Sequence, residues 1–282
     1  MTMPTPAAQT PAMRPQRRMR PPSRYYLAEV KRIAQVTPRL ARVTLTSPEM
    51  TSFAPGGPAD SLKVTFAAPG QEEPTMPGRD AEGHTLYTPE QELQPRRAYT
   101  VRHWDPATLE LDLDIVLHGH GPGGKWAAHA TKGDRLVIAD PRGAYKVDPA
   151  ATSMLLASDE SGLPALATIL EELPSTTRAQ VYVEVYDRDE EQPLPSAAAV
   201  EITWLHRRSD SEPTGKLLAA TLGSAKLPAL NAVWVACEAT AMREIRRHLL
   251  MDVGMDRALL NTQGYWKYGV GNHSDHDRGT EI

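Results

Sequence analysis

The feature that most constrains the fold is a change in hydrophobic rhythm near Pro149. Before it, short runs alternate apolar and polar residues, as in 110–115, Glu-Leu-Asp-Leu-Asp-Ile. A period of two places apolar side chains on one face of antiparallel strands. After it, short apolar runs alternate with stretches of helical spacing, such as 153–157 followed by 163–173. That second rhythm is typical of a parallel sheet covered by helices on both faces.

The two rhythms predict a β + α/β architecture in a chain of 282 residues, long enough for two cores. Six strand-like runs between 26 and 139 predict a six-stranded antiparallel Greek-key barrel over residues 24–149, with 69–95 as a long surface loop. A parallel-sheet, nucleotide-binding-like α/β domain is expected over 150–270, with strands near 153–157, 179–186, 200–205 and 232–236. Residues 1–23 form an expected disordered leader rich in Pro and Arg, and 271–282 an expected flexible tail.

Composition narrows the class of protein. Hydrophobic residues make up 40% and charged residues 23% of the chain, and no apolar run of about 18 residues occurs. Cys237 is the single cysteine, which excludes an intrachain disulfide and agrees with a reducing compartment. The net charge of −4 argues against a general nucleic-acid binder. We therefore expect a cytoplasmic monomer without a membrane segment.

The run Arg97-Ala98-Tyr99-Thr100 combines a cation, a flat ring and a hydroxyl on one strand. Arg97 and Tyr99 share a face of that strand, with Thr100 beside them. Such a set suits a flavin nucleotide: Arg97 for the pyrophosphate, Tyr99 for stacking on the isoalloxazine, and Thr100 for a hydrogen bond near the redox-active nitrogen. The alternative is an ordinary strand with an exposed Arg and a half-buried Tyr.

A second candidate anion site is the stretch from Asp114 to Ala127, which leaves a strand and opens a helix through several glycines. Glycines let backbone N–H groups approach a phosphate closely, and a helix start adds its positive dipole end. A plain turn is the alternative. The position of His118 and His120 beside this turn favours contact with a cofactor over metal binding, because no thiolate or carboxylate pattern completes a metal site.

Two segments of the second domain lie at expected carboxyl ends of parallel strands, where such sheets bind ligands. Asp159-Glu160-Ser161-Gly162-Leu163-Pro164 leads into the first helix, and Ser161 and Gly162 could present donors to a pyrophosphate. A capped helix start, with Asp159 or Ser161 as N-cap, explains the segment equally well. Cys237 and Glu238 end the fourth strand. Cys237 is either a buried small residue or a contact to a nicotinamide ring.

Taken together, these segments resemble the siderophore-interacting protein family, the flavin-dependent ferric-siderophore reductases of the ferredoxin-reductase superfamily. The resemblance extends from about Tyr25 to Gly269. Five segments show this resemblance, and in chain order they are residues 97–102, 114–127, 159–165, 234–239 and 264–269. The chain departs from the family at Ser158 and Cys237, where glycine is usual. We expect the larger side chains at these two positions to affect the affinity for pyridine nucleotide more than flavin binding.

The resemblance implies a barrel that binds FAD, a second domain that admits NADPH or NADH, and a ferric siderophore as electron acceptor, with no metal held by the protein. The implied catalytic residues are Tyr99 and Thr100. The implied FAD contacts are Arg97, Ala98, Tyr99, Thr100, Asp114, Val116, Leu117, His118, Gly121, Pro122, Gly123, Gly124, Trp126, Asp159, Ser161 and Trp266. The implied NAD(P)H contacts are Ser161, Gly162, Leu163, Pro164, Arg207, Arg208, Cys237 and Glu238.

Cations near the flavin would hold the chelate, and the resemblance points to Lys267, with Lys63 and Arg142 as further candidates. Each of the three is otherwise a solvated surface charge. Arg207 and Arg208 could bind a 2′-phosphate and so favour NADPH. Two other functions stay open. One is a flavin reductase that exchanges electrons with a ferredoxin-like protein, and the other is a non-catalytic binder of flavin or siderophore.

Overall fold

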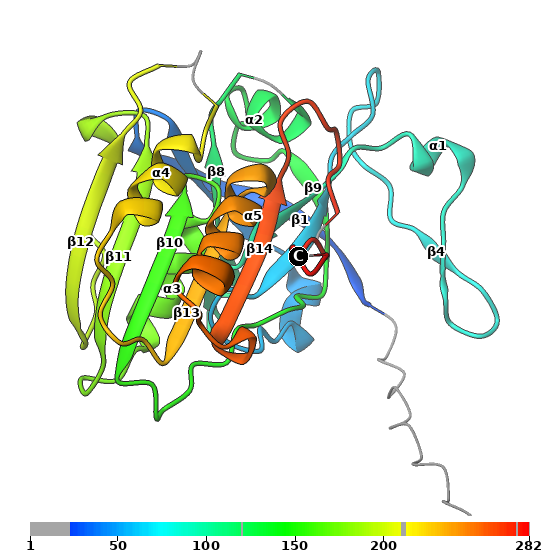
Figure 1. The fold of residues 1–282 in the computed structure, drawn as a ribbon. Coiled ribbons are helices and arrows are strands. Elements are labelled where there is room, and N and C mark those ends of the chain that lie inside the picture. Colours follow the sequence, from blue (N-terminus) through cyan, green and yellow to red (C-terminus); the bar gives the residue numbers. More distant parts are fainter. Residues whose placement is uncertain (1–22, 120, 210–212, 275, 282) are drawn as a thin grey trace, which may run out of the picture.

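The computed structural model describes residues 23–119, 121–209, 213–274 and 276–281. Residues 1–22 of the expected leader, and His120, lie outside the described residues. Figure 1 shows an antiparallel N-terminal half followed by a parallel sheet flanked by helices. The expected β + α/β architecture is confirmed.

The N-terminal sheet is antiparallel, with strand order β6-β3-β9-β1-β2-β8-β7. Its strands are β1 Tyr25–Thr37, β2 Leu40–Thr46, β3 Ser61–Thr65, β6 Arg96–Thr100, β7 His103–Asp105, β8 Glu110–Val116 and β9 Arg135–Ala139. A short 3-10 turn, η1, spans Pro48–Ser52. The sheet therefore has seven strands where six were predicted.

The additional strand arises because the expected run 99–104 is divided into β6 and β7. Between them, the Val101 N–H donates to the Asp60 carbonyl at 2.8 Å, and the Arg102 N–H donates to the Asp112 carbonyl of β8 at 3.0 Å. After β6, which pairs with β3, the chain thus crosses to β7, which pairs with β8 at the opposite end of the sheet. This crossing brings the two ends of the sheet together.

The period of two in β8 divides its side chains between the inside and the outside of the barrel. Leu111, Leu113 and Ile115 are buried in the barrel core. Asp114, on the other face, receives two hydrogen bonds from Arg42 of β2, at 2.7 and 2.8 Å. The sequence pattern therefore predicted the inward face of this strand correctly.

The expected surface loop 69–95 has local structure of its own and projects from the barrel (Figure 1). It contains the short hairpin β4 Gly78–Arg79 and β5 Thr85–Leu86, and the one-turn helix α1 Pro89–Glu92. Thr88 caps α1 through a reciprocal pair of hydrogen bonds with Gln91. Met76, Leu86 and Leu93 expose apolar side chains along this segment.

The second sheet is wholly parallel, in the order β12-β11-β10-β13-β14. Its elements are β10 Ser153–Asp159, α3 Leu163–Glu172, β11 Arg178–Val185, η2 Arg188–Glu190, β12 Ala199–His206, α4 Lys216–Ser224, β13 Ala232–Glu238, α5 Ala239–Arg247, η3 His248–Asp252, η4 Arg257–Leu259 and β14 Leu260–Trp266. Leu156 packs with α3 on one face, whereas Leu155 packs under α4 and α5 on the other.

The edge strand β14 was not predicted, because its residues 260–266 mix polar side chains with a glycine and lack a regular period.

Among the parallel strands, the order reverses between β10 and β13. The carboxyl ends of those two strands are where ligands of such sheets bind.

Contacts between the two halves run from the barrel to α3 and η2. The Ala59 N–H donates to Thr168 Oγ1 of α3 at 2.8 Å, and Arg102 donates to Glu171 at 2.7 Å. Arg39 lies over the ring of Tyr186, 3.3 Å from its centroid. These contacts join the domains through polar groups as well as packing.

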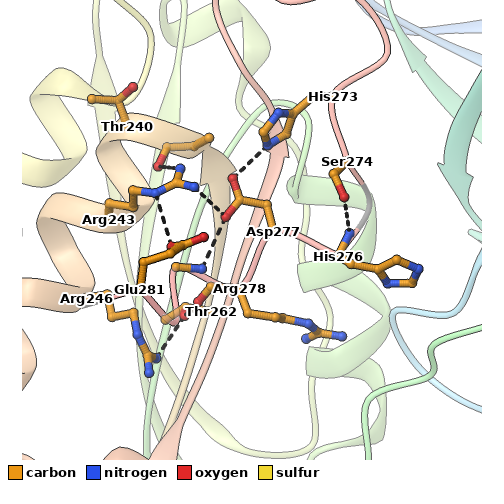
Figure 2. A network of polar contacts seen from close by, with 12 residues as sticks. Thr240, Arg243, Arg246, Thr262, His273, Ser274, His276, Asp277, Arg278 and Glu281 are labelled. Carbon is orange, nitrogen blue, oxygen red and sulfur yellow. Dashed lines mark hydrogen bonds and ion pairs between the residues drawn. The ribbon is translucent and has the colours of Figure 1, made fainter.

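The C-terminal segment, expected to be a flexible tail, contacts α5 and β14. Figure 2 shows Arg243 of α5 and His273 converging on the carboxylate of Asp277. Each bonds this carboxylate at a distance of 2.8 Å. The Asp277 carbonyl accepts from the Gly264 N–H of β14 at 2.9 Å. Burial alone would raise the pKa of Asp277, but hydrogen bonds from Gly279 and His273 and the charge of Arg243 bring it below the usual value.

Within the described residues, no helix is long and apolar enough to cross a membrane.

We expect Asp277→Asn to loosen this segment. Losing the charged contacts should reduce amide protection at Gly264 and Gly279 roughly tenfold, for about 1.5 kcal/mol of hydrogen bonding. Because the folded-state pKa is lowered, the wild-type stabilisation is present above about pH 4 and is lost as pH falls through that lower value. Hydrogen exchange measures both effects. Asp252→Asn removes the exposed pair with His248 and is the matched control. Unchanged exchange in Asp277→Asn would contradict the role of this pair.

Candidate functional site

Strand β6 carries the first expected motif and lies beside β3. Tyr99 is opposite Leu62 and Arg97 is opposite Val64, so these side chains share one face of the barrel wall. The Tyr99 ring meets Phe66 edge to face, with centroids 6.3 Å apart. Burial raises the pKa of the Tyr99 phenol far above its usual value, more than the nearby charge of Arg97 lowers it. Tyr99 is therefore a neutral phenol at physiological pH.

The glycine-rich turn meets this tyrosine. It forms helix α2, Gly121–Ala127, after a short connection from β8. A Cβ atom at Gly123 would lie 1.7 Å from the Tyr99 hydroxyl, and one at Gly124 would lie 3.1 Å from the Val116 carbonyl. Only residues without a side chain allow so close an approach. The fold thus brings together the two motifs that the sequence proposed for the flavin.

Other expected flavin contacts take different places. Trp126 packs against Phe66 with ring centroids 5.5 Å apart, so it belongs to the same aromatic group as Tyr99. Leu117 is partly buried against the barrel core, and His118 is exposed. The carboxylate of Asp114 is bound by Arg42, outside the barrel core. Phe66, which holds both Tyr99 and Trp126, was missed because it ends an ordinary apolar run.

The Arg97 guanidinium supplies the charge of this site. Its hydrogen bond is to the neighbouring Arg96 carbonyl at 2.7 Å, a neutral acceptor that leaves the positive charge uncompensated. Thr100 is buried at the end of β6. A cation without a carboxylate, a flat phenol and a close-packed glycine turn together fit the phosphate and ring portions of a flavin dinucleotide.

At the carboxyl edge of the parallel sheet, the Asp159 side chain joins three strands. One carboxylate oxygen accepts from the N–H and hydroxyl of Ser161, at 2.9 and 2.5 Å. The other accepts from the Glu238 N–H at 2.8 Å and from the Trp266 indole at 3.0 Å. Burial raises the pKa of Asp159, while these hydrogen bonds oppose the shift.

This carboxylate lies where the sequence placed a nucleotide pyrophosphate. The donors at the entry to α3 are already used, including the Gly162 N–H, which bonds to Asp159 at 3.4 Å. Leu163 and Pro164 are buried in the first turn of α3. Glu238 caps α5 through the Thr240 and Ala241 N–H groups, at 2.6 and 3.1 Å. The Ser161, Gly162, Thr240 and Ala241 N–H groups therefore bond to protein carboxylates in this structure.

Residues proposed for the nicotinamide side are engaged elsewhere. Arg207 donates to Glu160 at 2.6 Å and lies 3.5 Å from Glu184, so its charge is matched by carboxylates. Cys237 is fully buried under α4 and α5, where burial raises the pKa of the thiol. Arg208 remains exposed, at a left-handed φ of 56°. The structure does not bring Arg207 or Cys237 to an open cleft.

Ser158 packs tightly beneath the entry to α3. It is fully buried, and its hydroxyl has no hydrogen-bond partner among the described residues. A Cβ at Gly162 would lie 2.8 Å from the Ser158 Cβ and 2.2 Å from the Ala236 carbonyl. Ser158 therefore faces the packed interior of this turn, and its bulk lies under the α3 entry.

The cations expected to hold substrate are placed in two groups. Arg142 pairs with Ser61 in an isolated bridge, and half-buried Lys63 lies two residues further along β3. Lys267 is exposed in the turn that follows β14, closed by a hydrogen bond from the Val270 N–H at 3.1 Å. The fold thus places Arg142 close to Lys63 and carries Lys267 on the other domain.

One potential metal-ligand trio occurs among the described residues, Asp80, Glu82 and His84 in the β4–β5 hairpin. The His84 ring bonds Asp80 at 2.9 Å on the exposed surface. It was not among the sequence candidates, and a solvent-exposed ion pair accounts for it.

Comparison with known proteins decides the family. A model of the siderophore-interacting FAD-binding domain matches residues 29–145, and a siderophore-interacting protein model matches residues 151–269. The chain belongs to the siderophore-interacting protein family. It is 31% identical over 256 residues to the ferric vibriobactin reductase ViuB of Vibrio cholerae, covering 89% of this chain and 92% of that protein. An uncharacterized Mycobacterium tuberculosis protein is 35% identical over 253 residues, with 86% and 89% covered.

Solved structures of the siderophore-interacting protein family share the fold. A siderophore utilization protein from T. fusca has a TM-score of 0.80 at 35% identity, covering 90% of this chain and 97% of that one. SipS from Aeromonas hydrophila has a TM-score of 0.74 at 28% identity, covering 88% and 93%. A ferredoxin NADP+ reductase from Neisseria gonorrhoeae, at 15% identity and a TM-score of 0.54, shares the fold alone. The resemblance read from the sequence is confirmed.

We expect Gly123→Ala to lose most of its flavin. The new methyl would force the Tyr99 hydroxyl and α2 apart, which would open the site and lower FAD affinity by roughly a hundredfold, or about 3 kcal/mol. The ratio of absorbance at the flavin band to that at the protein band in purified protein measures this. Gly223→Ala, in α4 with open space around it, is the control and should keep its flavin. Full occupancy in Gly123→Ala would remove the turn from the site.

Proposed function

We propose that this protein is an FAD-dependent reductase that passes electrons from NAD(P)H, through the flavin, to an Fe(III)-siderophore and releases Fe(II) for iron assimilation. The close approach of Tyr99 to Gly123 carries this proposal, since it joins a stacking ring to an anion-binding turn. The match to a siderophore-interacting FAD-binding domain supports it, as does likeness to proteins named ferric vibriobactin reductase and ferric acinetobactin reductase.

The residues of the barrel would bind and orient the cofactor. Arg97 would hold the pyrophosphate with its forked donors, and the turn 121–124 would offer backbone N–H groups to the same anion. Tyr99 would lie against the isoalloxazine and exclude water from it. The Thr100 hydroxyl would hydrogen-bond near the reactive nitrogen. When bound, FAD supplies the means to take a two-electron donor and to pass on electrons one at a time.

Release of iron follows from the charge of the metal. Hydroxamate and catecholate oxygens are hard ligands that hold Fe(III) tightly, and one electron added to the iron weakens every such bond. The protein then needs only to bind the chelate close to the flavin. Lys63, Arg142 and Lys267 are the cations we propose for this contact, which would balance the charge of the chelate without binding iron.

Contacts in the parallel domain bear on the identity of the electron donor. Asp159 uses the donors at the entry to α3, and Arg207 is neutralised by Glu160 and Glu184. These contacts favour a second candidate, in which a ferredoxin-like protein delivers electrons directly to the flavin. The single Cys237 agrees with action in a reducing compartment, which we propose to be the cytoplasm.

Anaerobic mixing distinguishes the donors. With NADPH or NADH as donor, the flavin absorbance of the purified protein should bleach within the turnover time. With a ferredoxin-like donor, only the reduced iron–sulfur protein should bleach it. A flavin that neither donor reduces would leave a non-catalytic binder and contradict the enzyme assignment.

Lys267→Ala should slow the reduction of an anionic ferric chelate while flavin content stays unchanged. Losing one exposed cation near the acceptor should raise KM several-fold, for roughly 1 kcal/mol, with a smaller effect at high salt. Steady-state kinetics with a fixed donor measure this. Lys226→Ala, in the loop after α4, is the control and should behave as wild type. Unchanged kinetics for Lys267→Ala would remove it from the substrate site.

A further inference from the structure

The turn that carries Lys267 is bonded to the parallel sheet on both sides of that lysine. The Trp266 indole N–H donates to the Asp159 carboxylate at 3.0 Å, and the Tyr268 backbone N–H donates to the Glu238 carboxylate at 3.2 Å. Asp159 ends β10 and Glu238 ends β13, the two strands between which the order reverses. The residues before and after the lysine are thus each held by a carboxylate from a neighbouring strand end.

These two carboxylates are fixed by other donors as well. Asp159 is fully buried and Glu238 is 5% exposed. One oxygen of Asp159 accepts from the N–H and the hydroxyl of Ser161, at 2.9 and 2.5 Å. The Glu238 carboxylate accepts from the N–H groups of Thr240 and Ala241, at 2.6 and 3.1 Å. Each carboxylate is therefore oriented independently of the turn and offers it a fixed acceptor.

Strand β14 gains one residue relative to β13 immediately before this turn. Cys237 lies opposite Gly264, but the next residue, Glu238, lies opposite Trp266. Tyr265 is the additional residue, as in a β-bulge, and its ring packs edge to face on a tryptophan of β13. Bulges of this kind redirect the side chains that follow them and are frequent beside binding sites. The irregularity thus decides the direction in which the chain leaves the strand.

Beyond the lysine the chain turns back on itself. The Lys267 carbonyl accepts from the Val270 N–H at 3.1 Å, and Gly269 has a φ of 73°, which glycine adopts without strain. The side chain of Lys267 remains exposed. Its backbone is therefore restrained from three directions, while its ammonium group stays accessible to a ligand.

We infer that Asp159 and Glu238 are positioning residues that hold Lys267 toward the substrate. The inference rests on the proposed function, in which Lys267 contacts the ferric chelate. A lysine has a long and flexible side chain, so a ligand that binds it must restrict its motion. A restrained backbone removes part of that cost, because the ammonium group then explores a smaller volume. Asp159 acts through the Trp266 indole, and Glu238 acts through the Tyr268 N–H.

A double-mutant cycle tests whether these bonds act through the lysine. We would titrate the FAD-loaded protein with an anionic Ga(III) tris-catecholate, which flavins do not reduce, and follow binding by flavin fluorescence. Trp266→Phe keeps a ring and removes the N–H, and it should raise Kd about fivefold. In the Lys267→Ala background the same change should alter Kd less than twofold, because the group that it positions is already absent.

Two further measurements separate positioning from general stability. The Kd of Trp266→Phe should depend less on salt than that of wild type, since the lost contribution is that of a charge. Glu238→Gln, which places an amide NH₂ against backbone donors, should also raise Kd several-fold only when Lys267 is present. Trp204→Phe, in the edge strand β12, is the matched control and should bind as wild type.

The outcomes distinguish this inference from the proposed function. Equal weakening by Trp266→Phe with and without Lys267, an unchanged Kd in both Trp266→Phe and Glu238→Gln, or loss of FAD from Trp266→Phe would overturn the positioning role, even in a protein that reduces ferric chelates. Wild-type binding by Lys267→Ala would overturn it too. Coupling between residues 266 and 267 in a protein that reduces no ferric chelate would support the positioning role while the reductase assignment fails.

Discussion

The contact between the Tyr99 hydroxyl and Gly123 is the constraint on which the barrel site depends. No side chain fits at Gly123, so β6 and the start of α2 meet with only a ring between them. The register of β6 on β3 determines where that ring lies, and Phe66 holds it from the side. Barrel closure through Arg102 in turn keeps β6 beside the turn that leaves β8. A shift in any of these elements would separate the ring from the turn that we propose binds the pyrophosphate.

The parallel domain is organised around a buried charge. Asp159 joins the ends of β10, β13 and β14 by accepting from Ser161, Glu238 and Trp266. This arrangement holds the three strand ends together. It also engages the Ser161 and Glu238 N–H groups, which could otherwise bind a nucleotide phosphate. Arg207 is likewise neutralised by neighbouring carboxylates. Arg97 and Arg142 of the barrel domain bond neutral acceptors instead, and Lys267 is exposed in the turn after β14.

The sequence predicted those parts of the fold that depend on local pattern. The alternation in 110–115 indicated which face of β8 is buried, and the change of rhythm near Pro149 separated the antiparallel and parallel sheets. It missed β14, whose polar residues form a strand because they pair with β13, and it joined β6 to β7 because their separation depends on bonds to Asp60 and Asp112. Long-range contacts also decided the site. Tyr99 and Gly123 could be proposed from their chemistry, whereas the neutralisation of Arg207 depends on Glu160 and Glu184, which are distant in the chain.

The most direct test of the account is a crystal structure of the protein loaded with FAD. We expect the isoalloxazine against the Tyr99 ring, with the pyrophosphate between Arg97 and the backbone of residues 121–124. A flavin bound elsewhere, with Tyr99 and Gly123 still packed together beneath protein side chains, would contradict it.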